Sequence, residues 1–205
     1  MLNAKTALTF LKGVATKKAP MYVQFALAKG CNIKCLMCSV VENRTHEKEL
    51  KLPEIDILAR NLDKMGVSMI ILTGGEPFLN PHIFSLLDDI LSRGFPCLIL
   101  TNAYSVISRW KLKLLEYNKK YPCLMHLRVS LDHYTQEEHE NQRGKNTFLS
   151  TLKNLKWLLE NQFQVSIAGR ILKDETKEKA KEGFEFLFRE NKIPLLPNED
   201  NLALF

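Results

Sequence analysis

The sequence predicts an α/β fold: a partial (β/α) barrel of five to six βα units around a mainly parallel sheet. Short apolar runs alternate with longer segments of helical period, which is the pattern of repeated βα units. The apolar runs are nearly continuous, as expected of strands buried on both faces of a parallel sheet. Cysteine and glycine clusters follow the first two runs, at the strand ends where such folds bind ligands. We therefore expect both clusters to face one pocket.

Five apolar runs predict the strands, over residues 22–27, 68–72, 97–100, 125–131 and 165–168. The fourth run differs from the others because polar and apolar residues alternate along it. His126, Arg128 and Ser130 alternate with Leu127 and Val129. Since successive side chains of a strand point to opposite faces, the polar residues share one face of the sheet.

The segments between the strands predict helices, each with a stripe of apolar residues at helical spacing. Pro53 and Pro81 open the first two helices, and Gly66 and Gly94 end them. A third helix is expected around residues 106–117. The buried stripes of the helices with a clear period are Ile55, Leu58, Leu62 and Met65; Ile83, Leu86, Leu87, Ile90 and Leu91; Phe148, Leu152, Leu155 and Leu159; and Ala180, Phe184, Leu187 and Phe188.

The length of 205 residues allows one main domain. We expect an amphipathic lead-in segment over residues 1–20 and a core domain over residues 21–205. After Ile193 only the start of a sixth strand remains, and the chain ends on apolar residues with no clear final helix. This ending predicts a minimal or C-terminally truncated barrel, whose open lateral side needs a partner chain or a further segment to enclose a substrate.

Composition predicts a soluble protein, with 45% hydrophobic and 25% charged residues and no run of the roughly 18–20 apolar residues that spans a membrane. Lys and Arg number 29 against 23 Asp and Glu, so the net charge is +6, spread along the chain. That charge favours an acidic partner only weakly. The basic residues are not interleaved with aromatic residues, so nucleic acid is not the expected partner.

Three of the five cysteines lie within eight residues, with the spacing C-x3-C-x2-C formed by Cys31, Cys35 and Cys38. Such a loop can wrap one metal centre. Structural zinc sites normally use four protein ligands, and electron-transfer iron–sulfur clusters commonly use four cysteines. A triplet leaves one iron of a cluster without a protein ligand, open to a substrate or cofactor. The other two, Cys97 and Cys123, stand alone in or beside strands and are expected to be small buried packing residues.

A second motif, Gly74-Gly75-Glu76-Pro77, follows the second strand. Adjacent glycines let the backbone approach a ligand closely, while Glu76 and Pro77 set the polarity and direction of the exit. A Gly-Gly turn alone is most often an ordinary loop. One βα unit after a cysteine triplet, it indicates a cofactor site.

The cysteine spacing and the Gly-Gly-Glu-Pro motif closely resemble those of the radical S-adenosylmethionine (radical SAM) superfamily, and the resemblance spans roughly residues 21–171. The pattern is nearest to the peptide-maturase, sulfatase-maturase and molybdenum-cofactor-biosynthesis type of core, without a cysteine-rich auxiliary-cluster extension. The resemblance implies that Cys31, Cys35 and Cys38 hold a 4Fe-4S cluster whose fourth iron binds S-adenosylmethionine (SAM). One electron from a flavodoxin or ferredoxin type of donor then cleaves SAM, and a 5′-deoxyadenosyl radical abstracts hydrogen from a peptide or small-molecule substrate. The oxygen-sensitive cluster implies a cytoplasmic enzyme.

By the same resemblance, residues 74–77 contact the methionine ammonium group of SAM. Asn102 and Ser130 are placed to contact the ribose or carboxylate, and Arg170 to pair with the carboxylate through its planar fork. Each of these three has the alternative of satisfying local backbone at a strand end. Met37 stands where family members usually have an aromatic residue near the adenine.

His133 replaces a glycine that follows Ser-Leu-Asp in many relatives, and it lies with Tyr134 in a polar segment expected to be a loop over residues 132–145. Both are candidates for proton or hydrogen-atom transfer, the alternative being a solvated connection that caps the next helix. Glu137, Glu138 and Glu140 are interpreted as a solvated face.

Two other functions stay open at this stage. One is a noncatalytic interaction domain that holds zinc or a degenerate cluster. The other is a radical SAM enzyme that modifies RNA.

Overall fold

The computed structural model describes residues 22–38 and 67–205, together with the single positions 8, 11, 15, 53, 54, 57, 60 and 61. Its centre is one six-stranded sheet in which every neighbouring pair is parallel and the strand order follows the chain. The strands are β1 (Tyr22–Ala28), β2 (Met69–Gly74), β3 (Cys97–Thr101), β4 (Met125–Ser130), β5 (Gln164–Gly169) and β6 (Leu202–Leu204). The sheet is open, with β1 and β6 at its edges. The predicted α/β partial barrel is therefore confirmed.

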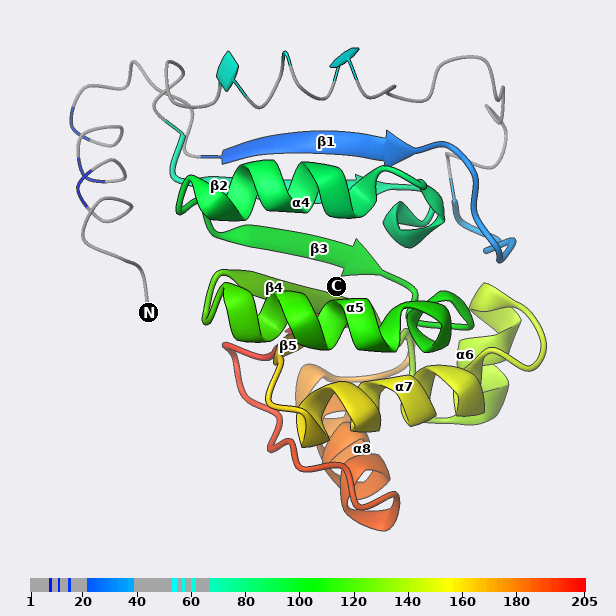
Figure 1. Ribbon diagram of the computed structural model, residues 1–205. Coiled ribbons are helices and arrows are strands. Elements are labelled where there is room, and N and C mark those ends of the chain that lie inside the picture. The colour runs from blue at the N-terminus through cyan, green and yellow to red at the C-terminus, as the bar shows by residue number, and fades with distance from the viewer. Residues whose placement is uncertain are drawn as a thin grey trace.

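The described helices that follow β2 are the short 3-10 helix η2 (Pro77–Leu79), α4 (Ile83–Ser92), α5 (Val106–Lys120), α6 (Gln136–Arg143), α7 (Phe148–Glu160) and α8 (Lys177–Glu190). Figure 1 shows α4, α5 and α7 in front of the sheet. Strand β6 confirms the expected start of a sixth strand and pairs with β5 from Ile167 to Gly169.

The alternation along β4 separates the two faces of the sheet. Leu127 and Val129 are fully buried in the core between sheet and helices. His126, Arg128 and Ser130 are half-buried on the opposite face. We call this opposite face the inner face, because it corresponds to the interior of a closed barrel. The sequence prediction of a shared polar face on this strand is confirmed.

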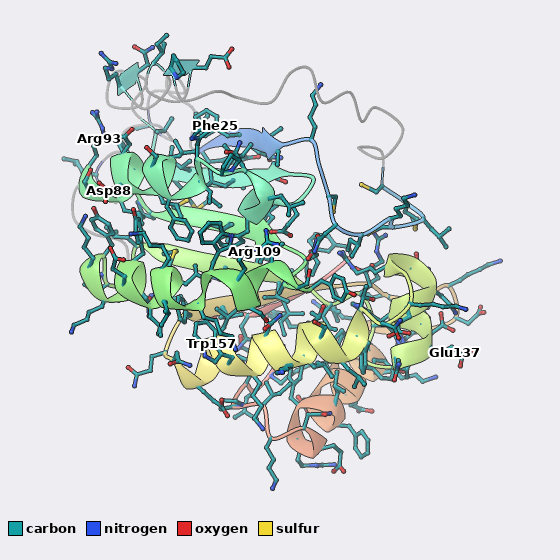
Figure 2. All side chains as sticks on the ribbon, turned by 45° about the vertical axis from the view of Figure 1, so that its right-hand side comes forward. Phe25, Asp88, Arg93, Arg109, Glu137 and Trp157 are labelled. Atoms are coloured by element: carbon teal, nitrogen blue, oxygen red, sulfur yellow. The ribbon has the colours of Figure 1, made fainter. Side chains whose placement is uncertain are left out.

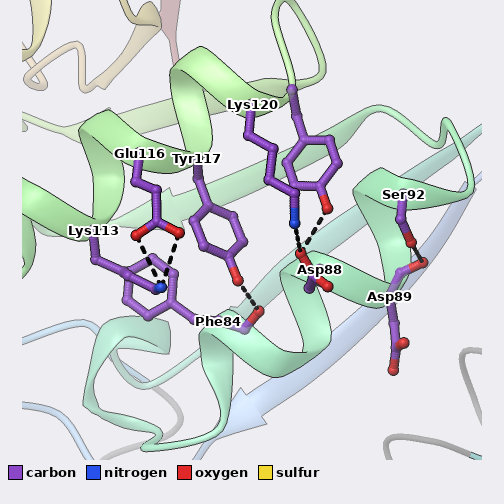
Figure 3. A network of polar contacts seen from close by, with 9 residues as sticks. Phe84, Asp88, Asp89, Ser92, Lys113, Glu116, Tyr117 and Lys120 are labelled. Carbon is purple, nitrogen blue, oxygen red and sulfur yellow. Dashed lines mark hydrogen bonds and ion pairs between the residues drawn. The ribbon is translucent and has the colours of Figure 1, made fainter.

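The predicted stripe of α4 is buried as expected, and the positive φ of Gly94 (79°) ends the helix. Figure 3 shows how α4 meets α5. The Tyr117 hydroxyl donates a hydrogen bond of 2.9 Å to the carbonyl of Phe84, and Lys120 Nζ donates one of 2.7 Å to Asp88. These contacts fix the outer layer while the strand ends remain available for a site.

Two sequence expectations are wrong. The segment 132–145 is not all loop, because Gln136–Arg143 form α6; this helix buries only His139, so it shows no apolar period. Cys123 is exposed, since it lies in the turn before β4 with a φ of 62° rather than in a strand. Cys97 is buried as expected, and burial raises the pKa of its thiol.

Some expectations fall on residues that the structure does not describe. The apolar stripe of the helix opened by Pro53 lies outside the described residues, as does most of the lead-in segment 1–20. The division into segments 1–20 and 21–205 stays a prediction. Within the described part of the chain, no helix is long and apolar enough to cross a membrane.

Candidate active site

The cysteine loop leaves the C-terminal end of β1 and is fastened at once to the end of β2. Gly75 N donates to the carbonyl of Ala28 at 2.5 Å, and Glu76 N donates to the carbonyl of Gly30 at 2.9 Å. A Cβ atom on Gly75 would overlap the Gly30 carbonyl, and one on Gly74 would overlap that of Ala28. Gly74 also has a φ of 117°, which residues with a side chain rarely adopt. The two glycines therefore let the cysteine loop approach β2 closely.

Glu76 is fully buried, and its side chain joins the ends of two strands. Its Oε1 accepts hydrogen bonds from Thr101 Oγ1 (2.9 Å) and Phe78 N (3.3 Å), and its Oε2 accepts one from Asn102 N (2.8 Å). Burial raises the pKa of Glu76 to about 7, against the lowering effect of these donors. Neither Glu76 nor Pro77 lines the cavity at the cysteine loop. This half of the motif instead supports the backbone of Gly74 and Gly75, which do line it.

Asn102, at the end of β3, connects the cysteine loop to the next strand. Its Nδ2 donates to Asn32 Oδ1 at 2.8 Å and lies 3.6 Å from Cys31 Sγ. Asn32 Nδ2 in turn donates to Ser105 Oγ at 3.2 Å. Helix α7 supports the turn that follows β3, because Asn154 Nδ2 donates to the carbonyl of Ala103 at 2.8 Å and also to that of Tyr104.

A cavity of about 310 Å³ opens between the cysteine loop and the strand ends. Nine residues predicted from the sequence lie on its wall, which brings together parts of the chain from β1 to β5. They are Cys31, Cys35, Met37, Cys38, Gly74, Gly75, Asn102, Ser130 and Arg170. The expectation that the two motifs face one pocket is confirmed for the three cysteines and for Gly74 and Gly75, but not for Glu76 and Pro77. The hydroxyl of Ser130 makes no hydrogen bond with any residue that the structure describes, so it is available to a ligand.

The wall also contains seven residues that were not predicted to bind the cofactor: Ile33, Thr73, Leu100, Thr101, Asp132, Gln142 and Arg143. Arg143 Nη2 contacts Asp132 Oδ1 at 2.9 Å, and Arg170 Nε lies 3.5 Å from Asp132 Oδ2. One buried carboxylate thus holds two guanidinium groups at the cavity. The sequence analysis places Arg143 in the polar segment 132–145, which is expected to be a loop, whereas the structure places it in the last turn of α6.

The outer part of the cysteine loop contacts α6 and β5. Leu36 N donates to the carbonyl of Gln142 at 2.9 Å, and Arg170 Nη1 lies 3.5 Å from Met37 Sδ. The side chain of Met37 is 66% exposed at the cavity mouth, so it can cover a flat ligand ring with a polarizable surface.

The three cysteines fit a metal cluster by their chemistry. All three are thiols on one cavity wall. Burial raises the pKa of Cys35; Arg143 opposes this rise, while charge on Cys31 and Cys38 adds to it. The thiols are therefore near enough to repel one another when ionised, and a positively charged metal centre would relieve that repulsion.

His133 and Tyr134 lie away from the cavity wall. Their rings stack with centroids 4.0 Å apart, and Tyr134 Oη donates to Glu175 Oε1 at 2.8 Å. His133 Nε2 lies 3.6 Å from the same oxygen, and Gly183 lies directly against the Tyr134 ring. The structure thus places this pair in the packing between the β4 exit and α8.

The fold and the site together define a class: partial-barrel α/β proteins in which a three-cysteine loop shares a cavity with a glycine-rich strand end. The model of the Radical SAM superfamily matches residues 26–187. The chain belongs to this superfamily, which is a family of enzymes.

Curated relatives include the antilisterial bacteriocin subtilosin biosynthesis protein AlbA of Bacillus subtilis, 29% identical over 73% of this chain and 33% of its own length. The AdoMet-dependent heme synthase of Methanosarcina barkeri is 26% identical over 80% of this chain and 46% of its own length. The chain thus spans between a third and a half of the length of these two relatives.

Among solved structures, Streptococcus suis SuiB bound to S-adenosylmethionine has a TM-score of 0.70 and 21% identity, covering 89% of this chain and 41% of SuiB. The structure of native anSMEcpe with bound AdoMet has a TM-score of 0.63 and 18% identity, covering 89% of this chain and 51% of that one. These likenesses show the fold.

Proposed function

We propose that Cys31, Cys35 and Cys38 hold a 4Fe-4S cluster and that SAM binds beside it in the same cavity. The observation that carries the proposal is the single cavity wall shared by the three thiols, the two glycines and the polar ends of β3, β4 and β5. When bound, the cluster supplies the electron that cleaves SAM and so provides a 5′-deoxyadenosyl radical for hydrogen abstraction.

The residues of the chain have separate roles in this proposal. Gly74 and Gly75 expose backbone groups to the methionine ammonium of SAM. Ser130 offers a hydroxyl, and Asn102 orients its amide beside Cys31. Arg170 is 37% exposed and only loosely paired with Asp132, so it is the arginine better placed to bind the SAM carboxylate. Met37 covers the adenine.

The proposed substrate is a peptide, with a small molecule as the alternative. A neighbouring solved structure is SuiB bound to the precursor peptide SuiA, and AlbA is named for bacteriocin biosynthesis. GTP 3′,8-cyclase of Clostridium perfringens, 25% identical over 77% of this chain, is the reason to keep a small molecule open. The electron donor we propose is of the flavodoxin or ferredoxin type, in the cytoplasm.

Zinc also takes thiolate ligands, so a structural zinc site is the alternative that the experiment must separate from a cluster. Structural zinc sites normally have four protein ligands, whereas three cysteines leave one iron of a 4Fe-4S cluster open.

The experiment is anaerobic reconstitution with iron and sulfide, followed by SAM and dithionite. We expect about four irons per chain and formation of 5′-deoxyadenosine. Cys31→Ala, Cys35→Ala and Cys38→Ala should each lose at least tenfold of the product, because each removes one of three protein ligands. Cys123→Ala is the matched control for cluster binding and for 5′-deoxyadenosine formed without substrate, since Cys123 is an exposed cysteine outside the wall that holds the three thiols. A colourless protein with one zinc per chain and no 5′-deoxyadenosine would overturn the proposal.

A further inference from the structure

The inner face of the sheet carries a polar group that the cofactor site does not use: Arg128, Ser166 and His126. Arg128 on β4 is in register with Ser166 on β5. Arg128 Nε donates to Ser166 Oγ at 3.3 Å, and His126 Nε2 lies 2.9 Å from the same oxygen. Ser166 is 2% exposed, so its hydroxyl is a buried anchor for both side chains. We call these three residues the inner-face group.

The positive charge of this group is not balanced within the described part of the chain. There, no carboxylate forms an ion pair with Arg128, and Ser166 is the partner of its only hydrogen bond. The terminal nitrogens Nη1 and Nη2 therefore remain available, although Arg128 is half-buried among apolar strand residues. A half-buried cation without a counter-ion is costly for folding alone, so a ligand is the simpler reason for its presence.

His126 does not supply a second charge. Burial lowers the pKa of His126, and the neighbouring Arg128 lowers it further, so the ring is neutral at pH 7. The group thus offers one planar guanidinium fork beside two neutral polar side chains. This arrangement matches a carboxylate, which a guanidinium binds through two parallel hydrogen bonds.

A second cavity of about 290 Å³ lies at this group, toward the N-terminal ends of the strands. Arg128, His126 and Gln164 line it together with apolar residues that include Met69, Leu98 and Leu124. Mostly apolar walls with a few convergent polar groups are typical of small-ligand sites. Arg128 is two residues before Ser130 of the first cavity, which is about 7 Å along a strand. One substrate molecule on the inner face can therefore reach both cavities.

We propose that the inner-face group binds a carboxylate of the substrate and so positions the bond to be attacked roughly two residues of extended chain away, near Ser130. This inference rests on the proposed function, because it takes the first cavity as the place of reaction. The carboxylate belongs either to an acidic side chain or to a chain terminus.

The test measures binding of three matched tripeptides and inorganic phosphate to the full reconstituted chain with SAM, by calorimetry and by the NMR resonances of the His126 ring. The peptides are acetyl-Ala-Glu-Ala-amide, acetyl-Ala-Gln-Ala-amide and acetyl-Ala-Ala-Ala with a free carboxyl end. A charge-assisted hydrogen bond predicts that at least one carboxylate peptide binds about tenfold or more tightly than the glutamine peptide. The peptide that binds identifies the source of the carboxylate.

Variants show whether Arg128 carries the effect. Arg128→Gln should abolish the difference between the peptides, and Arg128→Lys should keep part of it, because lysine retains the charge but not the fork. Ser166→Ala should weaken binding by releasing Arg128 Nε. Arg109→Gln is the matched control: Arg109 lies exposed on α5 in the outer layer (Figure 2), and this variant loses the same charge without changing the inner face.

Equal binding of all three peptides would overturn the inference, as would a carboxylate preference that persists in Arg128→Gln. Binding of phosphate alone would also overturn it. Failure of this inference would appear in the peptide affinities. Failure of the proposed function would appear separately, as missing 5′-deoxyadenosine in the absence of any peptide.

Discussion

Gly74 and Gly75 decide how closely the cysteine loop approaches the end of β2. Their hydrogens lie where a methyl group would overlap the carbonyls of Ala28 and Gly30. Both carbonyls belong to the segment that leads into Cys31. A substitution at either glycine would therefore displace the backbone that leads into Cys31, without altering any side chain of the cavity.

We predict that Gly75→Ala destabilises the protein by about 1–3 kcal/mol, the usual cost of overpacking, and weakens SAM binding at least tenfold. Urea unfolding and equilibrium binding of SAM measure the two effects. Gly94→Ala is the control, because Gly94 has a φ of 79° at the end of α4 and lies outside the cavity wall. It should lose about 1 kcal/mol of stability through backbone strain but keep SAM affinity. Equal losses of affinity in both variants would contradict this account.

Glu76 makes stability depend on pH. Burial raises its pKa to about 7, whereas an ordinary glutamate in the unfolded chain has a pKa near 4.5. Between these values the unfolded chain releases the proton and the folded chain keeps it, so the contribution of Glu76 is full below pH 4.5 and is lost as pH rises to 7. The stability difference between the wild type and Glu76→Gln should change by on the order of 3 kcal/mol over this window.

The measurement is the free energy of unfolding from urea titrations at pH 4.5, 5.5, 6.5 and 7.5, in steps of about one unit that cover the window. Asp88→Asn provides a contrast, because hydrogen bonds from Lys120 and then Tyr121 lower the pKa of Asp88. The stability from Asp88 is present above its ordinary pKa and falls only in acid. A flat difference between the wild type and Glu76→Gln across the window would contradict the assignment.

At the scale of elements, the cysteine loop is held by the ends of several βα units at once. The end of β2 holds its first residues, the end of β3 holds Asn32, and the end of α6 holds Leu36. Helix α7 reaches the site indirectly, because Asn154 is 1% exposed and donates to two carbonyls of the turn after β3.

We predict that Asn154→Ala costs about 2 kcal/mol, because it leaves buried carbonyl groups without donors. It should also weaken SAM binding several-fold by loosening Asn102. Asn118→Ala is the control, since Asn118 makes one long contact of 3.5 Å on α5. Thermal unfolding and SAM titration of both variants provide the measurement. Unchanged SAM affinity in a destabilised Asn154→Ala would show that α7 supports the fold but not the site.

The elements that the sequence predicts well are those with a clear buried face. Five strands and the helix α4 follow from apolar runs and from the stripe that begins at Ile83. Helix α6 could not be predicted in this way, because His139 is its only buried residue and its existence depends on contacts after β4. Cys123 was misjudged because a sequence shows that a residue neighbours a strand, but not on which side of the last turn it lies.

The site divides similarly. The cysteine triplet and the two glycines can be predicted as one site because local spacing carries their chemistry. The ion pair of Arg143 with Asp132 cannot, since it depends on tertiary packing between β4 and α6. The sequence predicts a cofactor contact for Glu76, but its side chain supports strand ends and does not line the cavity, and only the fold reveals the direction in which it points.

At the scale of the molecule, the sheet is open and β1 lies at one edge, with Gln24 and Ala26 exposed. The net charge of +6 is modest, so binding to RNA should be weak and nonspecific.

We predict that the affinity for transfer RNA falls steeply between 50 and 200 mM salt, to a dissociation constant of roughly 100 μM or weaker. Filter binding over this salt range is the measurement. Tight binding that persists at 200 mM salt would favour the RNA-modifying alternative over a peptide or small-molecule enzyme.

The central claim is that three cysteines leave one iron of the cluster open to SAM. Electron paramagnetic resonance of the reduced, reconstituted chain tests it most directly. We expect the signal of a reduced 4Fe-4S cluster that changes when SAM is added, and a smaller change in Gly75→Ala. A cluster signal that is identical with and without SAM, or the absence of any cluster in a folded chain, would contradict it.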